Sequence, residues 1–161
     1  MIFGRRLERK RTGGVRVRLE RRERELLAGL AAELGARLVD DTEAPDLARL
    51  FPPAYAEDPE DEQEYRGLMR GDLLDGKREA LRVFAATLDR EELTGEELEA
   101  WLRVLNDLRL VLGTRLDVSE ETLVHGLDPR DPDAPELALY GYLSWLQEQA
   151  VEAASAGRAG W

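Results

Sequence analysis

One stretch of the chain, residues 94–118, constrains the fold more than any other. Its sequence is TGEELEAWLRVLNDLRLVLGTRLDV, in which large apolar residues recur every three or four positions, as on one face of an α-helix. Thr94, followed three residues later by Glu97, is a capping-box start, and Gly113 is a natural helix end. We therefore predict a central helix against which weaker amphipathic helices pack. Its apolar face comprises Leu98, Trp101, Leu102, Leu105, Leu108, Val111 and Leu112.

Residues 2–20 have the pattern of a β-hairpin. Val15, Val17 and Leu19 alternate with charged residues, which is the period of two expected for a strand with one buried face. The Thr-Gly-Gly run at 12–14 suits the turn, because glycine adopts positive φ at low cost. An isolated hairpin is only marginally stable in water, so its apolar face must dock on helices or on a partner.

The rest of the chain is predicted to be helical, with proline-containing loops between the helices. The pair Gly71-Asp72 favours a break between two of these helices, although one continuous helix also fits the pattern. The helical spacing places Leu26, Leu68 and Met69 on inward faces. The predicted helices span residues 21–38, 46–50, 60–70, 72–88 and 135–154.

These elements predict a mostly α (α+β) fold, a single-domain helical bundle with an N-terminal β-hairpin. The domain covers residues 1–155, of which 2–20 form the hairpin and 21–155 the helical body, and residues 156–161 form a flexible tail. A chain of 161 residues is long enough for one domain with a sizeable core and too short for two.

The composition excludes several classes of protein. With 43% hydrophobic and 35% charged residues, the chain belongs with folded globular proteins rather than disordered ones. No apolar run has the length of a membrane span or the form of a signal-peptide core, so we expect a cytoplasmic protein with no membrane association. The chain has no cysteine, which excludes disulfides, thiolate catalysis and thiol redox switches.

Charge is distributed unevenly along the chain. Residues 1–24 carry ten Arg or Lys and three Glu, a net +7, whereas the remaining 137 residues carry 13 basic and 31 acidic groups, a net −18. Such asymmetry suggests an interaction surface, or a basic arm that lies on the protein's own acidic body. The hairpin arginines are basic enough to meet phosphate. Without interleaved aromatic residues, however, we favour a solvated or internally paired strand face over nucleic-acid binding.

The sequence provides little evidence for catalysis. His125 is the single histidine, and no phosphate loop, dinucleotide fingerprint or nucleophile motif is present. Asp128, Asp131 and Asp133 could hold a hard cation weakly, but solvation of a loop is the favoured interpretation. We therefore expect a protein that is not an enzyme, with no catalytic residues, no metal and no cofactor.

The polar face of the central helix is more informative than any catalytic motif. Glu99, Arg103 and Asp107 lie four residues apart and can form a ladder of charges. Asn106 is the only asparagine in the chain, and asparagine is a poor residue for a helix interior, so its amide is expected to have a use. We favour a hydrogen bond to a loop or to the hairpin over a role in a partner-binding face.

The run WLRVLNDLRLVLGTRL, at residues 101–116, resembles the signature of an actinobacterial family catalogued as a domain of unknown function. Members of that family are often encoded beside the Clp protease adaptor. The stretches ERELLAGL at 23–30, RLFPPAY at 49–55 and YGYLSWLQ at 140–147 support the resemblance. It covers most of the chain, from the hairpin to the last helix.

The resemblance implies a function in regulation. The family includes an oxidative-stress regulator that senses oxidation through a cysteine pair and associates with a stress sigma factor. A cytoplasmic, non-enzymatic regulator that contacts the transcription machinery is implied for this chain too. Thiol sensing cannot be carried over, because the chain lacks cysteine, and the spacing of Met69 predicts a buried side chain that is a poor substitute. What the resemblance leaves is a scaffold that binds a partner.

Our leading hypothesis is a regulatory protein whose partner is a sigma factor or RNA polymerase. Direct nucleic-acid binding through the hairpin is the alternative, and an accessory role in the Clp proteolytic system is a third. A homodimer is also compatible with the sequence. The candidate partner-binding residues are Arg5, Arg9, Arg16 and Arg18 on the hairpin, and Asn106, Asp107, Arg109 and Arg115 on the central helix.

Overall fold

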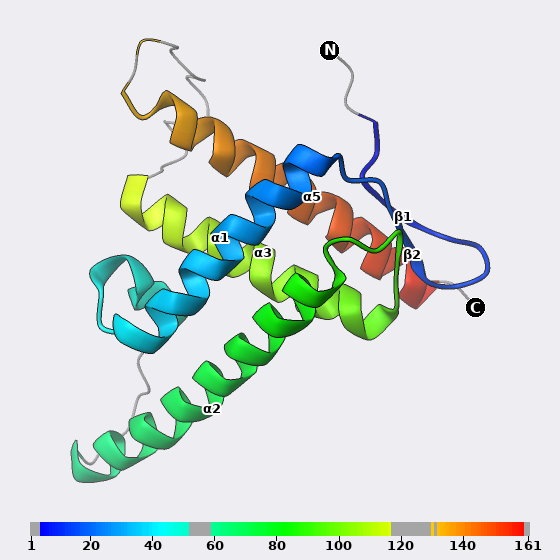
Figure 1. Ribbon diagram of the computed structural model, residues 1–161. Coiled ribbons are helices and arrows are strands. Elements are labelled where there is room, and N and C mark those ends of the chain that lie inside the picture. The colour runs from blue at the N-terminus through cyan, green and yellow to red at the C-terminus, as the bar shows by residue number, and fades with distance from the viewer. Residues whose placement is uncertain (1–3, 52–58, 117–129, 131, 160–161) are drawn as a thin grey trace.

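The computed structural model describes residues 4–51, 59–116, 130 and 132–159. The chain folds mostly into helices, with a small antiparallel sheet near its N-terminus, as the sequence predicts (Figure 1). His125 and the aspartates at 128 and 131 lie outside the described residues. The elements in chain order are β1 Leu7–Arg9, β2 Val15–Val17, α1 Arg21–Asp40, η1 Pro45–Leu50, α2 Pro59–Thr87, β3 Glu92–Leu93, α3 Gly95–Leu116 and α5 Ala134–Ala159.

The helix α3 is the centre of the fold, and it packs against α2, α5 and η1 (Figure 1). Its predicted capping box is confirmed. The Thr94 backbone N–H donates to Glu97 Oε1 at 2.8 Å, and the Glu97 backbone N–H donates to Thr94 Oγ1 at 3.2 Å. Trp101 is fully buried, and its indole Nε1 donates to Thr87 Oγ1 of α2 at 2.7 Å. One hydrophobic core extends from β1 to α5 around this helix.

Gly113 does not end the helix, contrary to the prediction. It is buried within α3, which continues to Leu116. A Cβ placed on Gly113 would lie 3.1 Å from the ring of Tyr140, so the glycine permits a close approach of α5 to α3. Gly113, which the sequence pattern marks as a helix end, instead allows α3 and α5 to pack closely.

The hairpin is confirmed, and it gains a third strand that the sequence pattern did not reveal. Leu7 pairs with Val17 across β1 and β2, and Val15 pairs with Leu93 across β2 and β3. Gly13 and Gly14 form the turn with φ values of 92° and 79°. Because β3 has only two residues, its two-residue periodicity is too short to recognise, and only its pairing with β2 identifies it as a strand.

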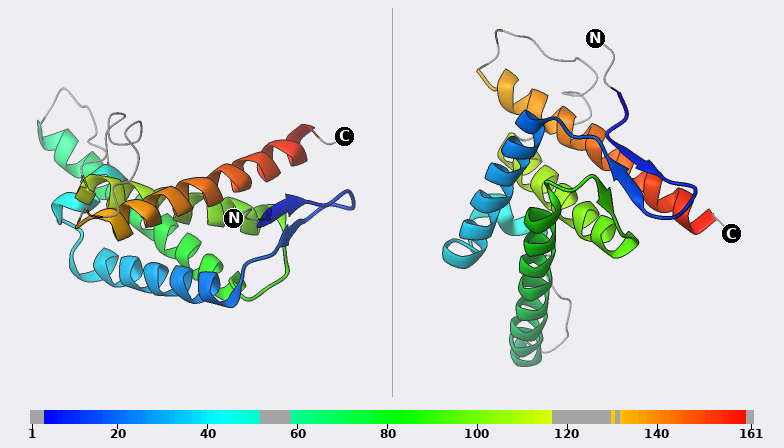
Figure 2. Two further views of the ribbon diagram at one scale, coloured as in Figure 1. Left: turned by 90° about the horizontal axis from the view of Figure 1, so that it is seen from above. Right: turned by 45° about the vertical axis from the view of Figure 1, so that its right-hand side comes forward.

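The helix α2 is continuous, so the break favoured at Gly71-Asp72 is absent and the alternative of one helix is correct. Its N-terminal half projects beyond the other helices (Figure 2). Leu68 is 68% exposed and Met69 is 40% exposed, although their spacing predicted burial. The prediction is wrong because no neighbouring helix covers this part of α2 within the described chain. Leu26 of α1 is also exposed, at 43%.

The C-terminal half of α5 lies beside the hairpin (Figure 2). The helix extends to Ala159, beyond its predicted end near residue 154 and into the segment predicted to be a flexible tail. Gln149 is buried and its Oε1 accepts the backbone N–H groups of Arg6 and Leu7 at 2.6 and 3.1 Å. This side chain fixes the first strand of the hairpin on α5. None of the helices among the described residues is long and apolar enough to cross a membrane.

Candidate functional site

Several hairpin cations are held by the protein's own body. Arg5 forms an ion pair with Glu152 at 3.4 Å, and Arg9 Nε donates to the Ala153 carbonyl at 3.0 Å. Lys10 Nζ lies 3.1 Å from Glu92 Oε2. Two of the four hairpin residues predicted to bind a partner, Arg5 and Arg9, are therefore engaged with α5. In this part of the hairpin, basic side chains therefore lie on the protein's own body, which is one of the two alternatives predicted from the charge distribution.

The remaining two candidates, Arg16 and Arg18, behave differently. Arg16 lies in β2 and Arg18 directly follows it. Both side chains are exposed, and they alternate with the buried Val15, Val17 and Leu19. No ion pair links either guanidinium to another residue in the part of the chain that the structure describes. We call these two residues the β2 arginine face.

Two hollows adjoin the β2 arginine face. One, of about 310 Å³, is lined by Arg16 together with the turn. The other, of about 560 Å³, is lined by both arginines and also by Glu91 and Glu92. The surface is therefore basic at its centre and acidic at one side.

The central-helix candidate Asp107 is not on the surface. It is buried, and its carboxylate forms an ion pair with Lys77 of α2, with both oxygens 3.1 Å from Nζ. Burial raises the pKa of Asp107, while the nearby charges of Lys77 and Arg103 act in the opposite direction. The predicted ladder through Arg103 is replaced by a contact between helices, so Asp107 is not available to a partner.

Asn106 and Arg109 face α5 rather than a loop or the hairpin. Arg109 donates to Gln147 Oε1 at 2.7 Å and lies with its Cζ 5.5 Å from the centre of the Tyr140 ring. Gln147 Nε2 in turn donates to Asn106 Oδ1 at 3.4 Å. As expected, the Asn106 side chain takes part in a hydrogen bond. The bond joins α3 to α5, however, and not to a loop or to the hairpin.

Arg115 takes part in a network at the other end of α3. Its guanidinium lies 3.3 Å from Asp46 of η1. The two carboxylate oxygens of Asp46 also accept a bidentate hydrogen bond from Arg37 of α1, in which Nη1 lies 2.6 Å from Oδ2. Arg37 and Arg115 together hold the pKa of Asp46 below its usual value, and Asp46 raises the pKa of Arg37. This network joins α1, η1 and α3.

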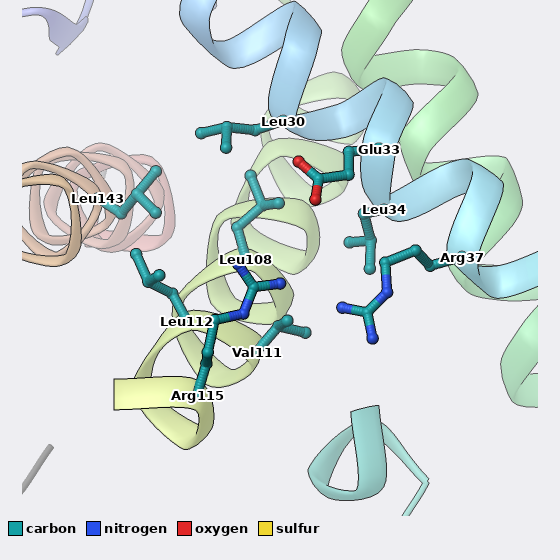
Figure 3. Close-up of a pocket in the computed structure, with 9 residues that line it drawn as sticks. All are labelled: Leu30, Glu33, Leu34, Arg37, Leu108, Val111, Leu112, Arg115 and Leu143. Atoms are coloured by element: carbon teal, nitrogen blue, oxygen red, sulfur yellow. The ribbon is translucent and has the colours of Figure 1, made fainter. Parts of the chain in front are cut away.

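A small pocket lies beside this network, between α1, α3 and α5 (Figure 3). Its walls are mainly leucine side chains, with Arg37 and Arg115 reaching in from opposite sides. Its volume is only about 50 Å³, far below the several hundred Å³ of a typical cofactor pocket. Among the described residues, no group of three or more acidic, histidine or cysteine side chains could hold a metal ion.

Sequence reasoning did not identify a groove between α1 and α5, which has a volume of about 580 Å³. It combines the exposed Leu26 of α1 with aromatic and small residues of α5. Two features of the sequence could have indicated this groove. Leu26 lies at the edge of the apolar stripe of α1, and the small residues Ala138 and Gly141 are three positions apart on α5. We call this feature the α1–α5 groove, lined by Arg6, Glu20, Arg22, Glu23, Leu26, Ala138, Gly141, Tyr142 and Trp145.

Three polar side chains of the α1–α5 groove, those of Arg6, Glu23 and Tyr142, are bound to one another. Arg6 Nε lies 2.8 Å from Glu23 Oε1, and the Tyr142 hydroxyl donates to Glu23 Oε2 at 2.6 Å. Burial, followed by the adjacent Glu23, raises the pKa of Tyr142 far above its usual value, so the phenol remains a hydrogen-bond donor. The Arg6 guanidinium lies over the Trp145 ring at 5.8 Å. Arg6 thus contacts both Glu23 and Trp145, and it links the hairpin to α1 and α5 at this groove.

Comparison with curated proteins identifies relatives that have been named as regulators. The oxidative stress regulator AosR of Mycobacterium tuberculosis (strain H37Rv) is 31% identical over 124 residues, which cover 66% of this chain. A Mycobacterium leprae (strain TN) protein that carries the AosR name is 30% identical over 146 residues, or 80% of this chain. The aligned parts amount to 56% and 65% of those relatives, so the chain spans about three fifths of their length. No solved structure matches the chain significantly.

The family is identified by a model of the domain as a whole. The model described as "Domain of unknown function (DUF2017)" matches residues 5–154, from the start of the hairpin to the last third of α5. This match includes all the elements that form the core, and it confirms the resemblance drawn from the central helix. The chain belongs to the DUF2017 family, which includes relatives named as oxidative stress regulators.

Proposed function

We propose that this protein is a non-enzymatic, cytoplasmic regulator that acts in the stress response through contacts with the transcription machinery. The β2 arginine face is the surface that makes the contact, and a sigma factor or RNA polymerase is the partner. The names of the mycobacterial relatives support the regulatory part of this proposal. Because the chain has no cysteine, the signal does not reach it through its own thiols.

The observation that carries the proposal is the contrast within the hairpin. Arg5, Arg9 and Lys10 have partners on the protein itself, whereas Arg16 and Arg18 do not among the described residues. The hairpin that bears them is docked by buried hydrogen bonds to Gln149, so the two arginines are presented on a fixed surface. Fixed, unpaired arginines suit recognition of carboxylates on a partner.

The test is a crosslinked pull-down from the source organism, comparing the wild type with the double variant Arg16→Glu/Arg18→Glu. The matched control is Arg49→Glu, which reverses an exposed charge on η1, where no ion pair to Arg49 occurs in the described chain. We expect RNA polymerase or a sigma factor to be recovered with the wild type and the control and lost with the double variant. Equal recovery with all three proteins would contradict the role of this face. Recovery of Clp components in place of polymerase would favour the proteolytic role.

Direct nucleic-acid binding is the second candidate, because unpaired arginines also attract phosphate. The carboxylates of Glu91 and Glu92 beside the arginines oppose a continuous phosphate backbone, as does the net charge of −11. If this candidate is correct, DNA affinity falls steeply with salt, by about one power of salt concentration for each arginine contact, and is lost in Arg16→Glu/Arg18→Glu. Salt-insensitive or absent binding rejects it.

A further inference from the structure

The α1–α5 groove presents apolar surface that no described element covers. A single exposed leucine is ordinary on a protein surface. Leu26, however, is 43% exposed within a hollow of about 580 Å³ that it shares with Trp145 and Tyr142. Aromatic side chains in a concave surface are the usual anchors of protein recognition. The groove shares no residue with the β2 arginine face, so its role is separate from the proposed function above.

The α5 side of the groove is open because its residues are small. Ala138 and Gly141 lie one turn apart on this helix, and both line the groove. A Cβ added to Gly141 would meet nothing within 4 Å, so the space above the glycine is empty. Small residues on one side of a groove between two helices let a third helix approach closely and insert its apolar side chains.

The charges in the groove indicate what occupies it. Glu23 already binds Arg6 and accepts a hydrogen bond from the Tyr142 hydroxyl. These side chains therefore offer few free hydrogen-bonding groups of the kind that orient a small ligand. Arg22 is exposed, lines the groove, and has no ion pair among the described residues. An acidic side chain beside an apolar stripe complements this arrangement.

The geometry points to the α1–α5 groove as a docking site for an amphipathic α-helix of another protein. That helix places apolar residues spaced three and four positions apart over Leu26, Gly141 and Trp145, and an acidic residue opposite Arg22. Binding buries the apolar surface that is now exposed and gives Arg22 a partner.

The test begins with a displayed library of peptides that tile the proteins of the source organism, selected against the full chain. Enriched peptides are synthesised with a fluorescent label, and their affinities are measured by anisotropy. The blocking variant is Gly141→Leu, which fills the groove and replaces a helical glycine with a stronger helix former. Its matched control is Gly71→Leu, which adds the same side chain to an exposed, unobstructed position of α2.

We expect enriched peptides to share apolar residues at helical spacing with a flanking Asp or Glu. Gly141→Leu should weaken their binding by about tenfold or more, whereas Gly71→Leu should leave it unchanged. Arg22→Glu should weaken peptide binding by about fivefold, which is the effect expected from the loss of one solvent-exposed ion pair. The variant Arg16→Glu/Arg18→Glu should bind these peptides normally, which separates this site from the β2 arginine face.

Three outcomes would overturn the inference. The first is the enrichment of no peptide with apolar helical spacing. The second is peptide binding that Gly141→Leu does not weaken. The third is a dimer of the free protein, detected by sedimentation, that Gly141→Leu dissociates, because the occupant would then be a second copy of the chain.

Discussion

At the scale of single residues, the buried ion pair between Lys77 and Asp107 joins α2 to α3. Asp107 is buried on α3, and Lys77, one of two lysines in the chain, reaches it from α2. Removing one partner leaves a charge in a poorly hydrated site, whereas replacing both partners removes the cost of burying them. The pair therefore specifies how α2 and α3 align more than it adds to the net stability.

Replacement of Asp107 alone should destabilise the protein more than replacement of both residues. We expect Asp107→Ala to lower the free energy of unfolding by about 2 to 4 kcal/mol, because Lys77 loses its counter-charge. The double variant Lys77→Met/Asp107→Leu should regain most of that loss. Urea denaturation measures both values. A double variant as unstable as the single one would show that the pair contributes more than alignment.

The same variants differ in their dependence on pH. Burial raises the pKa of Asp107 in the folded protein, so the folded state binds its proton more tightly than the unfolded state does. Its contribution to stability therefore decreases as the pH rises from about 4 through the folded pKa, and the double variant should lack this decrease.

At the scale of elements, the turn of the hairpin and β3 depend on each other. Gly14 has a φ of 79°, and a Cβ there would lie 2.6 Å from Glu92 Oε1 and 3.3 Å from the Leu93 carbonyl oxygen. Gly13 has a φ of 92° but would meet nothing within 4 Å. The two glycines share a backbone requirement, and only the second also permits contact with the third strand.

Alanine at these two positions should therefore have unequal effects. We expect Gly13→Ala to cost about 1 kcal/mol of stability, the penalty of a left-handed conformation. Gly14→Ala should cost about 2 kcal/mol, because the Glu92 side chain must also turn aside and the Leu93 carbonyl must shift slightly. Thermal unfolding followed by circular dichroism provides the comparison. Equal losses at the two glycines would show that contact with β3 does not restrict this turn.

At the scale of the whole molecule, stability is concentrated around α3 and decreases toward the N-terminal half of α2. Trp101 and Leu105 are fully buried at the centre, whereas Leu68 and Met69 are exposed on a helix that projects from the bundle. Segments with few buried contacts open at lower free energy than the core does. Met69 is 40% exposed, contrary to the expectation from its spacing, so oxidants can reach this side chain more readily than a buried one.

Native-state hydrogen exchange should reproduce this gradient. We expect the amides of α3 between Leu98 and Leu112 to exchange most slowly, by global unfolding, and those around Gly71 in α2 to exchange much sooner by local opening. Mass spectrometry of peptic fragments resolves the two segments. Uniform protection along α2 would mean that its projecting half is stabilised by contacts beyond those described.

The local features of this protein could be predicted from its sequence because each depends on residues close together in the chain. The apolar stripe and capping box of α3, the alternation in β2 and the Gly13-Gly14 turn are of this kind. The lack of cysteine, which excludes thiol sensing, likewise needs no structure.

The tertiary structure alone decided which surfaces remain free, because burial depends on which elements meet. The spacing that predicted an exposed Asp107 and a buried Met69 describes one helix at a time, and both predictions were reversed by the positions of neighbouring helices. Arg9 is bound to α5, whereas Arg16 has no ion pair among the described residues, and a groove opens beside Leu26. These differences arise in the same way from the docking of the hairpin and α1 on α5. Sequence periodicity therefore predicted most elements of this protein, and long-range packing determined which of their surfaces are exposed.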